Sequence, residues 1–83
     1  MSISEIVMEL PTEHEKNVFG QLDSFAKKLE RTLHITLIAR DSEIKILGDE
    51  MRVNQARRII EQLIELSKRG TTITEQNVDY TIS

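Results

Sequence analysis

The chain has 83 residues, of which 39% are hydrophobic and 30% charged, and its formal net charge is -3. This composition is typical of one small globular domain, and the acidic balance argues against strong autonomous binding of nucleic acid, because such binders are usually basic. The lack of cysteine excludes disulfides and thiolate metal sites and suits a reducing compartment, so we expect a cytoplasmic protein. No apolar stretch approaches the roughly 18 residues of a membrane span, so we expect no membrane partner.

The N-terminal part of the chain predicts a strand and a short helix. Apolar and polar side chains alternate over about residues 3–10, which is the period of a half-buried strand, and Pro11 ends it. Thr12 and Glu15 have the spacing of a capping box, so we expect a helix of one or two turns that stops at Gly20. The inward side chains of the strand should be Ile6, Met8 and Leu10.

A second helix is predicted between Asp23, its expected N-cap, and His34. His34 should end this helix in the left-handed conformation, which glycine prefers and which histidine tolerates better than most residues. The expected buried stripe has helical spacing and comprises Leu22, Phe25, Ala26, Leu29 and Leu33.

Two short strands and a long helix are predicted next. Side chains alternate over residues 35–39 and again over residues 44–46, on either side of a polar Asp41-Ser42 turn, which is typical of a β-hairpin. Asp49 is the expected N-cap of the long helix, which should end before Gly70. The buried stripe of this helix should comprise Val53, Ala56, Ile59, Ile60, Leu63 and Ile64.

The last segment, residues 70–83, predicts a linker and a short helix. Thr74 is the expected N-cap, and Ile73 and Val78 have the spacing of a hydrophobic staple. A helix of about two turns is marginal alone, so it either docks on the domain or leads onward into a longer protein. We favour the second interpretation.

The predicted order of strand, helix, helix, strand, strand and helix indicates one α+β domain over residues 1–83. A three-stranded antiparallel sheet should carry its helices on one face, with the short C-terminal helix added. This order is the topology of KH nucleic-acid-binding modules, and the segment FGQLDSFAKKLERTLHITLIARDSEIKILGDEMRVNQARRIIEQLI resembles such a module. Its GxxG loop, which contacts the nucleic-acid backbone in KH domains, has become Gly20-Gln21-Leu22-Asp23.

Three segments carry a more specific resemblance. VFGQLDSFAKKLERTLHITLIARDSEIKILGD, QARRIIEQLIELSKRG and TTITEQNVDYTI are similar to the N-terminal KH-like domain of the PhoH-like (phosphate starvation-inducible) P-loop ATPases. The resemblance implies a parent protein with a following ATPase domain, proposed to act in RNA metabolism, in which ATP and Mg²⁺ bind. This chain has no GxxxxGK(S/T) phosphate loop, because none of its glycines has the required lysine partner. We therefore expect no cofactor and no catalysis in the chain itself.

Six residues are candidates for contact with nucleic acid, namely Gly20, Gln21, Lys27, Lys28, Arg31 and Arg40. Gly20 would let a phosphate approach the backbone at a helix N-terminus, and Gln21 would donate a hydrogen bond to it. The cations of the second helix and of a neighbouring strand would form a basic stripe along the nucleic-acid backbone. The competing interpretations are a simple helix stop at Gly20 and a solvated charged face, and the negative charge of Asp23 favours the former.

The patterns of catalytic and metal sites are incomplete. His14 begins a His-Glu pair, but Val18 stands where a zinc-protease helix needs its second histidine. Ser24, Ser42 and Ser67 have no basic partner in the predicted elements, so we expect no nucleophilic catalysis. Turn and cap roles explain the carboxylates near the hairpin better than acid–base work or Mg²⁺ binding does. These carboxylates are Asp41, Glu43, Asp49 and Glu50.

Two functions remain open. The first is an accessory domain that contacts single-stranded RNA weakly and delivers it to the ATPase domain that the resemblance implies. The second is a docking or oligomerisation module of the same ATPase, which the degenerate loop and the acidic charge favour. Its partner would be the ATPase domain or another copy of the full-length protein. Its contact surface would be the exposed side of the long helix or the outer sheet face, Val7, Thr36, Ile38 and Leu47.

Overall fold

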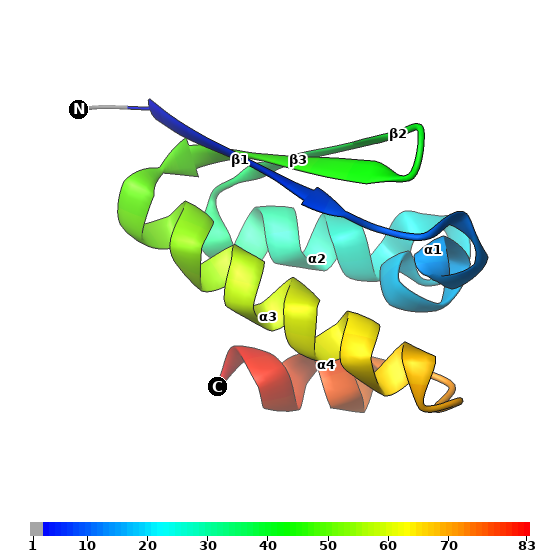
Figure 1. Ribbon diagram of the computed structural model, residues 1–83. Coiled ribbons are helices and arrows are strands. Elements are labelled where there is room, and N and C mark those ends of the chain that lie inside the picture. The colour runs from blue at the N-terminus through cyan, green and yellow to red at the C-terminus, as the bar shows by residue number, and fades with distance from the viewer. Residues whose placement is uncertain (1–2) are drawn as a thin grey trace.

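The structure is a computed structural model that describes residues 3–83 as a sheet packed against helices (Figure 1). The elements in chain order are β1 (Ile3–Glu9), α1 (Thr12–Phe19), a 3-10 turn (Gln21–Asp23), α2 (Ser24–Leu33), β2 (Thr36–Arg40), β3 (Glu43–Asp49), α3 (Glu50–Lys68) and α4 (Glu75–Ile82). The predicted α+β fold is confirmed, including the order of its elements. No helix within residues 3–83 combines the length and the hydrophobicity that crossing a bilayer requires.

The sheet has the strand order β1-β3-β2, and both outer strands run antiparallel to β3. Ile6, Ile46 and Leu37 form one row across the three strands and pack into the core. Val7 and Ile38 belong to the next row and lie exposed on the opposite face, because successive side chains of a strand alternate between the two faces. The sheet is therefore covered by helices on one face, as predicted.

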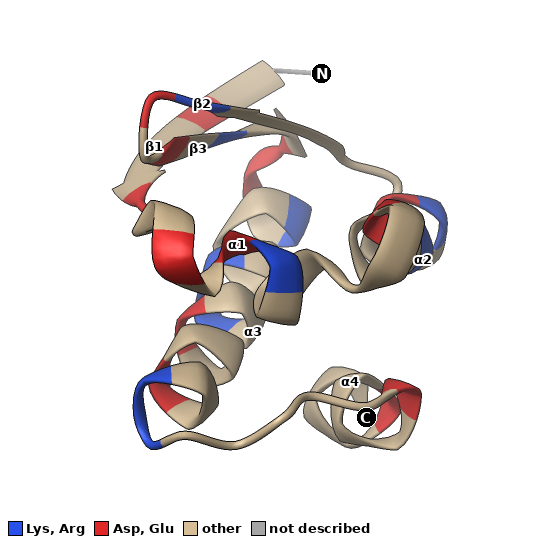
Figure 2. Ribbon diagram, turned by 90° about the vertical axis from the view of Figure 1, so that its right-hand side faces the viewer, with Lys and Arg blue, Asp and Glu red and all other residues tan. Residues whose placement is uncertain are grey.

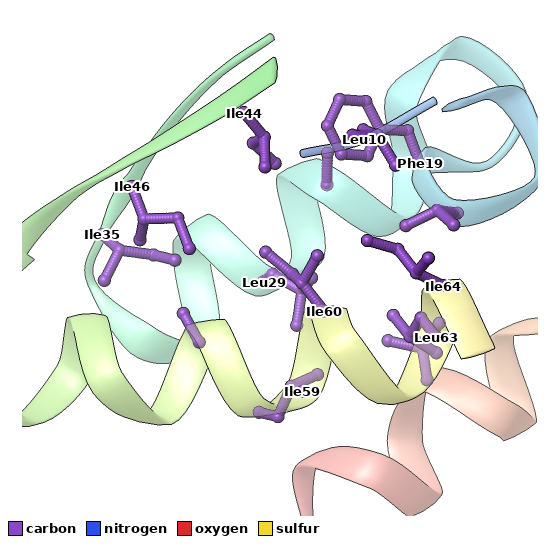
Figure 3. Packing of buried hydrophobic residues seen from close by; sticks show 14 of the residues in the cluster. Leu10, Phe19, Leu29, Ile35, Ile44, Ile46, Ile59, Ile60, Leu63 and Ile64 are labelled. Atoms are coloured by element: carbon purple, nitrogen blue, oxygen red, sulfur yellow. The ribbon is translucent and has the colours of Figure 1, made fainter. Parts of the chain in front are cut away.

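The core lies between the sheet and the helices, with α3 as its main support (Figure 3). The complete predicted stripe of α3 is buried, and each of its valine, leucine and isoleucine side chains contributes roughly 1.5–3 kcal/mol relative to an exposed one. Leu29 of α2 and Ile44 of β3 pack into the same cluster. Asp49 caps α3 as predicted, since its Oδ2 accepts a hydrogen bond from Met51 N at 3.2 Å.

Two helix starts differ from their predictions. Pro11 is the N-cap of α1, and Thr12 does not cap it, because Thr12 Oγ1 instead lies 2.9 Å from Ser42 Oγ. Asp23 is the N-cap residue of α2 but forms no capping hydrogen bond, because its backbone is left-handed (φ 58°, ψ 29°) and not extended as capping requires. Leu22 is left-handed too (φ 55°), so the turn carries its side chain away from the predicted buried stripe and leaves it 87% exposed.

The remaining helix ends follow their predictions. Gly20 (φ 81°) ends α1 and His34 (φ 56°, ψ 50°) ends α2, both with positive φ. Thr74 caps α4 in a capping box, in which Asn77 N donates to Thr74 Oγ1 and Asn77 Oδ1 accepts from Thr74 N. Val78 is fully buried, so α4 docks on the domain beside α3. A continuation of the segment into a longer protein stays a prediction.

Candidate nucleic-acid interface

Gly20 shapes the turn between α1 and α2. Its N–H donates to Lys16 O at 2.8 Å, and its carbonyl accepts from Asp23 N at 3.1 Å. A Cβ at this position would lie 2.7 Å from Cγ of Phe25, so the buried glycine leaves no room for a side chain. The structure thus gives Gly20 the role of a helix stop, which was the competing interpretation of this residue.

A shallow hollow beside this turn brings together four of the six candidate residues. Its lining comprises Gln21, Leu22, Ser24, Phe25, Lys27, Lys28, Arg31 and Glu75. The side chains of Gln21, Lys27 and Arg31 are exposed, whereas Phe25 is half-buried and packs against the core. The local arrangement therefore offers a hydrogen-bond donor and cations around an apolar contact, as a phosphate-bearing ligand requires.

No side chain caps the first turn of α2, whose first residue Ser24 lies in the lining of the hollow. The N–H of Ser24 already donates to Gln21 O, so it is the positive end of the helix dipole that attracts an anion at this terminus. Asp23 precedes this turn and opposes that attraction with its negative charge. The dipole of α2 therefore attracts a phosphate at this turn, whereas the carboxylate of Asp23 repels it.

Arg40 lies apart from the other candidates. It belongs to the outward row of β2 and lines a second hollow on the outer sheet face, together with Ile38 and Lys45. The alternation of side chains along β2 carries Ile38 and Arg40 away from the helices. Arg40 therefore does not line the hollow that the cations of α2 line, and a basic stripe that joins them stays a prediction.

Lys28 is engaged by α4. Its Nζ lies 3.0 Å from Glu75 Oε2 and also forms an ion pair with Asp79. The hydrogen bonds with Asp79 and with Glu75 raise the pKa of Lys28 above its ordinary value. Lys27 and Arg31 have no ion-pair partner among the described residues, so they are the cations that the hollow leaves available.

Glu30 and Asn17 form hydrogen bonds that were not predicted from the sequence. Glu30 Oε2 accepts a hydrogen bond from Leu37 N at 2.9 Å, so a carboxylate occupies one donor at the free edge of β2. Asn17 Nδ2 donates to Thr71 O at 2.7 Å, and Asn17 Oδ1 accepts from Ile73 N at 2.8 Å. The second set of bonds fixes the segment between α3 and α4. In the sequence, the polar Asn17 stands directly before the apolar Val18 and Phe19, which is the one sign that its side chain has a structural role. That sign does not identify Thr71 and Ile73 as its hydrogen-bond partners.

Ser67 does have a basic partner, which corrects the sequence analysis. His14 Nδ1 lies 2.7 Å from Ser67 Oγ, although 53 residues separate the two in sequence. Ser67 is only 7% exposed, and its Oγ also accepts a hydrogen bond from Asn17 Nδ2 at 2.9 Å. A buried hydroxyl that accepts such a bond is poorly placed as a nucleophile, so the contact serves to join α1 to the end of α3.

Two of the four carboxylates near the hairpin, Asp41 and Asp49, have the predicted turn and cap roles, whereas Glu43 begins β3 and Glu50 begins α3. Asp41 and Ser42 have positive φ in the β2–β3 turn, and Asp49 caps α3. Within residues 3–83, no three His, Asp or Glu side chains gather closely enough to hold a metal ion.

The comparisons with known proteins agree with the resemblance found in the sequence. No protein-family model matches the chain. A PhoH-like protein of Bacillus subtilis (strain 168) is 35% identical to it over 66 residues, which cover 80% of this chain and 21% of that protein. The resemblance to PhoH-like proteins is confirmed. The chain spans about a fifth of the length of this PhoH-like relative, because the alignment covers 21% of it.

A solved structure supports the fold. The crystal structure of a protein of unknown function from Aeropyrum pernix matches 99% of this chain and 46% of its own, with a TM-score of 0.78 and 16% identity. At this level of identity the match concerns the fold alone, and it extends over nearly the whole of this chain.

Proposed function

We propose that this chain is an accessory domain of a PhoH-like ATPase and that it makes a weak contact with single-stranded RNA at the hollow beside the α1–α2 turn. The observation that carries this proposal is the convergence of Gln21, Lys27 and Arg31 around the turn where KH domains have their GxxG loop. The relation to a PhoH-like protein supports the assignment of the parent. ATP and Mg²⁺ would bind in the ATPase domain of that parent, and catalysis would occur there, in the cytoplasm.

The contact should be weak for reasons that the hollow itself provides. Two cations, Lys27 and Arg31, are available for phosphate, whereas Lys28 is already paired. Asp23 stands at the turn and Glu75 in the wall of the hollow, so two carboxylates oppose phosphate. We expect a dissociation constant near the ~10⁻⁴ M limit of non-specific binding at physiological salt. Two phosphate contacts to a single strand give a log–log salt slope of about -1.4.

Titration of the ¹⁵N-labelled protein with a short single-stranded RNA tests this proposal. Amide shifts should concentrate in the α1–α2 turn and the first turns of α2. The Lys27→Gln/Arg31→Gln variant should lose most of the affinity and most of the salt dependence. A matched control, Arg52→Gln/Lys68→Gln, removes two exposed cations of α3 and should bind like the parent. Equal losses of RNA affinity in the two variants would show that only the net charge of the domain matters, and would contradict a binding site at the hollow.

A second candidate function, docking or oligomerisation, is favoured by one observation. Val7 and Ile38 are 49% and 44% exposed on the outer face of the sheet, on either side of Lys45. Burying this row would bring apolar side chains out of water in an interface with the ATPase domain or with another copy. Sedimentation equilibrium of the parent and of the Ile38→Lys variant tests this role. A parent that remains monomeric and does not bind the ATPase domain would remove its support.

A further inference from the structure

The helix α4 presents an acidic side to the basic side of α2. Figure 2 shows acidic residues on α4, which lies below α2 in this view and in Figure 1. The contact between the two helices is specific, because Lys28 pairs with both Glu75 and Asp79. These two carboxylates are four residues apart on one helix face, so one ammonium group can reach both.

The same contact reaches into the hollow. Glu75 is part of its lining, so the carboxylate that holds Lys28 also stands where phosphate would approach Lys27 and Arg31. Lys28 is half-buried, with 22% of its side chain exposed, and its amine faces α4. An anion that enters the hollow therefore meets one engaged cation and one competing carboxylate.

The attachment of α4 is suited to release. The helix has eight residues, Val78 is its one fully buried side chain and Ile82 is partly buried against the core, whereas Tyr80 is 82% exposed. A helix this short is marginal when it is detached, so its position depends on this packing, on the Asn17 bonds to the preceding segment and on the Lys28 pairs.

We propose that α4 is an autoinhibitory strap, in which Glu75 and Asp79 occupy Lys28 and exclude nucleic-acid phosphate from the hollow. This inference rests on the proposed function and deepens it, because it names Lys28 as a further phosphate-binding residue that the strap withholds. RNA phosphate and the α4 carboxylates compete for the same ammonium group. RNA binding must then weaken the docking of α4 by the same factor by which docked α4 weakens RNA binding.

The Glu75→Gln/Asp79→Asn variant tests the strap, since it keeps the shapes of both side chains and removes both charges. Its affinity for single-stranded RNA should rise about five- to tenfold, and its log–log salt slope should steepen by about 0.7, as one additional phosphate contact requires. The control variant Glu13→Gln/Glu50→Gln removes two charges at exposed positions in the first turns of α1 and α3. It should remain within about twofold of the parent.

The gain in RNA affinity of the double variant could come from the release of Lys28 or simply from weaker repulsion between α4 and phosphate. Adding Lys28→Gln to the double variant distinguishes these two causes. If Lys28 binds the phosphate, this third change abolishes the gain, whereas a gain that survives it overturns the inference. In the parent, the RNA titration should also shift the α4 amides, and an unmoved α4 would count against the strap. Circular dichroism checks that each variant is folded. The single variant Asp79→Asn should show part of the gain in RNA affinity, which tests the strap with a smaller change to the protein.

The two proposals fail in different ways. Unchanged affinity in the double variant, with binding that still depends on Lys27 and Arg31, overturns the strap and leaves the RNA contact standing. Absence of RNA binding in the parent and in every variant overturns both.

Discussion

Replacement of Gly20 by alanine probes the turn on which the hollow depends. The backbone at Gly20 (φ 81°, ψ 172°) lies in a region that is essentially restricted to glycine, and another residue there costs roughly 1–3 kcal/mol. The added Cβ would lie 2.7 Å from Cγ and Cδ2 of Phe25 and 2.9 Å from Ser24 Oγ, which is too close for any unstrained contact. Displacement of a packed ring costs about 1–3 kcal/mol more. We expect a loss of about 3 kcal/mol and a fall in Tm of about 12–24 °C.

Urea unfolding followed by circular dichroism measures this loss, and Gly70→Ala is its matched control. Gly70 also has a positive φ, 89°, but a Cβ there would meet nothing within 4 Å. The control should therefore lose only the cost of backbone strain, about 1 kcal/mol. The difference between the two variants isolates the contact with Phe25, and Phe25→Leu should recover part of it in the Gly20→Ala background because leucine lacks the rigid ring.

Two outcomes would refute this reasoning. Equal losses of unfolding free energy in Gly20→Ala and Gly70→Ala would show that the close contact between the added Cβ and Phe25 does not destabilise the protein. A Gly20→Ala protein that unfolds like the parent would show that the turn adopts a different backbone, and the hollow would then have a different lining.

Three further predictions concern charge and ligands. Calorimetric titration of the chain with Mg-ATP should give no saturable binding tighter than about 10 µM, because the sequence has no phosphate loop, and such binding would contradict the expectation that ATP binds outside this chain. Asp23→Gly should change stability by less than about 1 kcal/mol in urea unfolding, because Asp23 forms no capping bond and glycine accepts its positive φ, and it should tighten RNA binding in the same titration. The raised pKa of Lys28 means that its ion pairs stabilise the fold below the ordinary lysine pKa and lose this effect as the pH rises through the raised value. Glu75→Gln/Asp79→Asn should lower that pKa in an NMR titration of the lysine side chain, and an unchanged value would contradict the pairing.

Local patterns in the sequence were sufficient for most of the fold. The stripe of α3, the caps at Asp49 and Thr74 and the left-handed His34 all depend on residues within a few positions of one another. Their physical causes are helical periodicity, side-chain capping and steric tolerance of positive φ, which act over that short range. The helix α2 starts after Asp23 as predicted, but the prediction for Leu22 was wrong because helical spacing was extended one residue beyond the N-cap, where Leu22 and Asp23 are left-handed.

The candidate site could be predicted only in part, because its energetics depend on contacts between distant segments. The spacing of Lys27 and Arg31 on α2 was readable, and so was the position of the turn. The engagement of Lys28 was not, since 47 residues separate it from Glu75. No local pattern distinguishes a lysine that will be paired in this way from one that remains in solvent. The His14–Ser67 contact escaped prediction for the same reason.

The weakness that we propose for the RNA contact has a local origin. The net charge of -3 averages over the whole surface, whereas a phosphate in the hollow responds mainly to charges within about one Debye length, roughly 8–10 Å. Asp23 at the turn and Glu75 in the lining are such charges, and Asp79 acts by holding Lys28. Variants with the same net charge should therefore differ in RNA affinity according to which of these carboxylates they retain. A domain of acidic composition can then gain affinity through the movement of one short helix, without any change in its sequence.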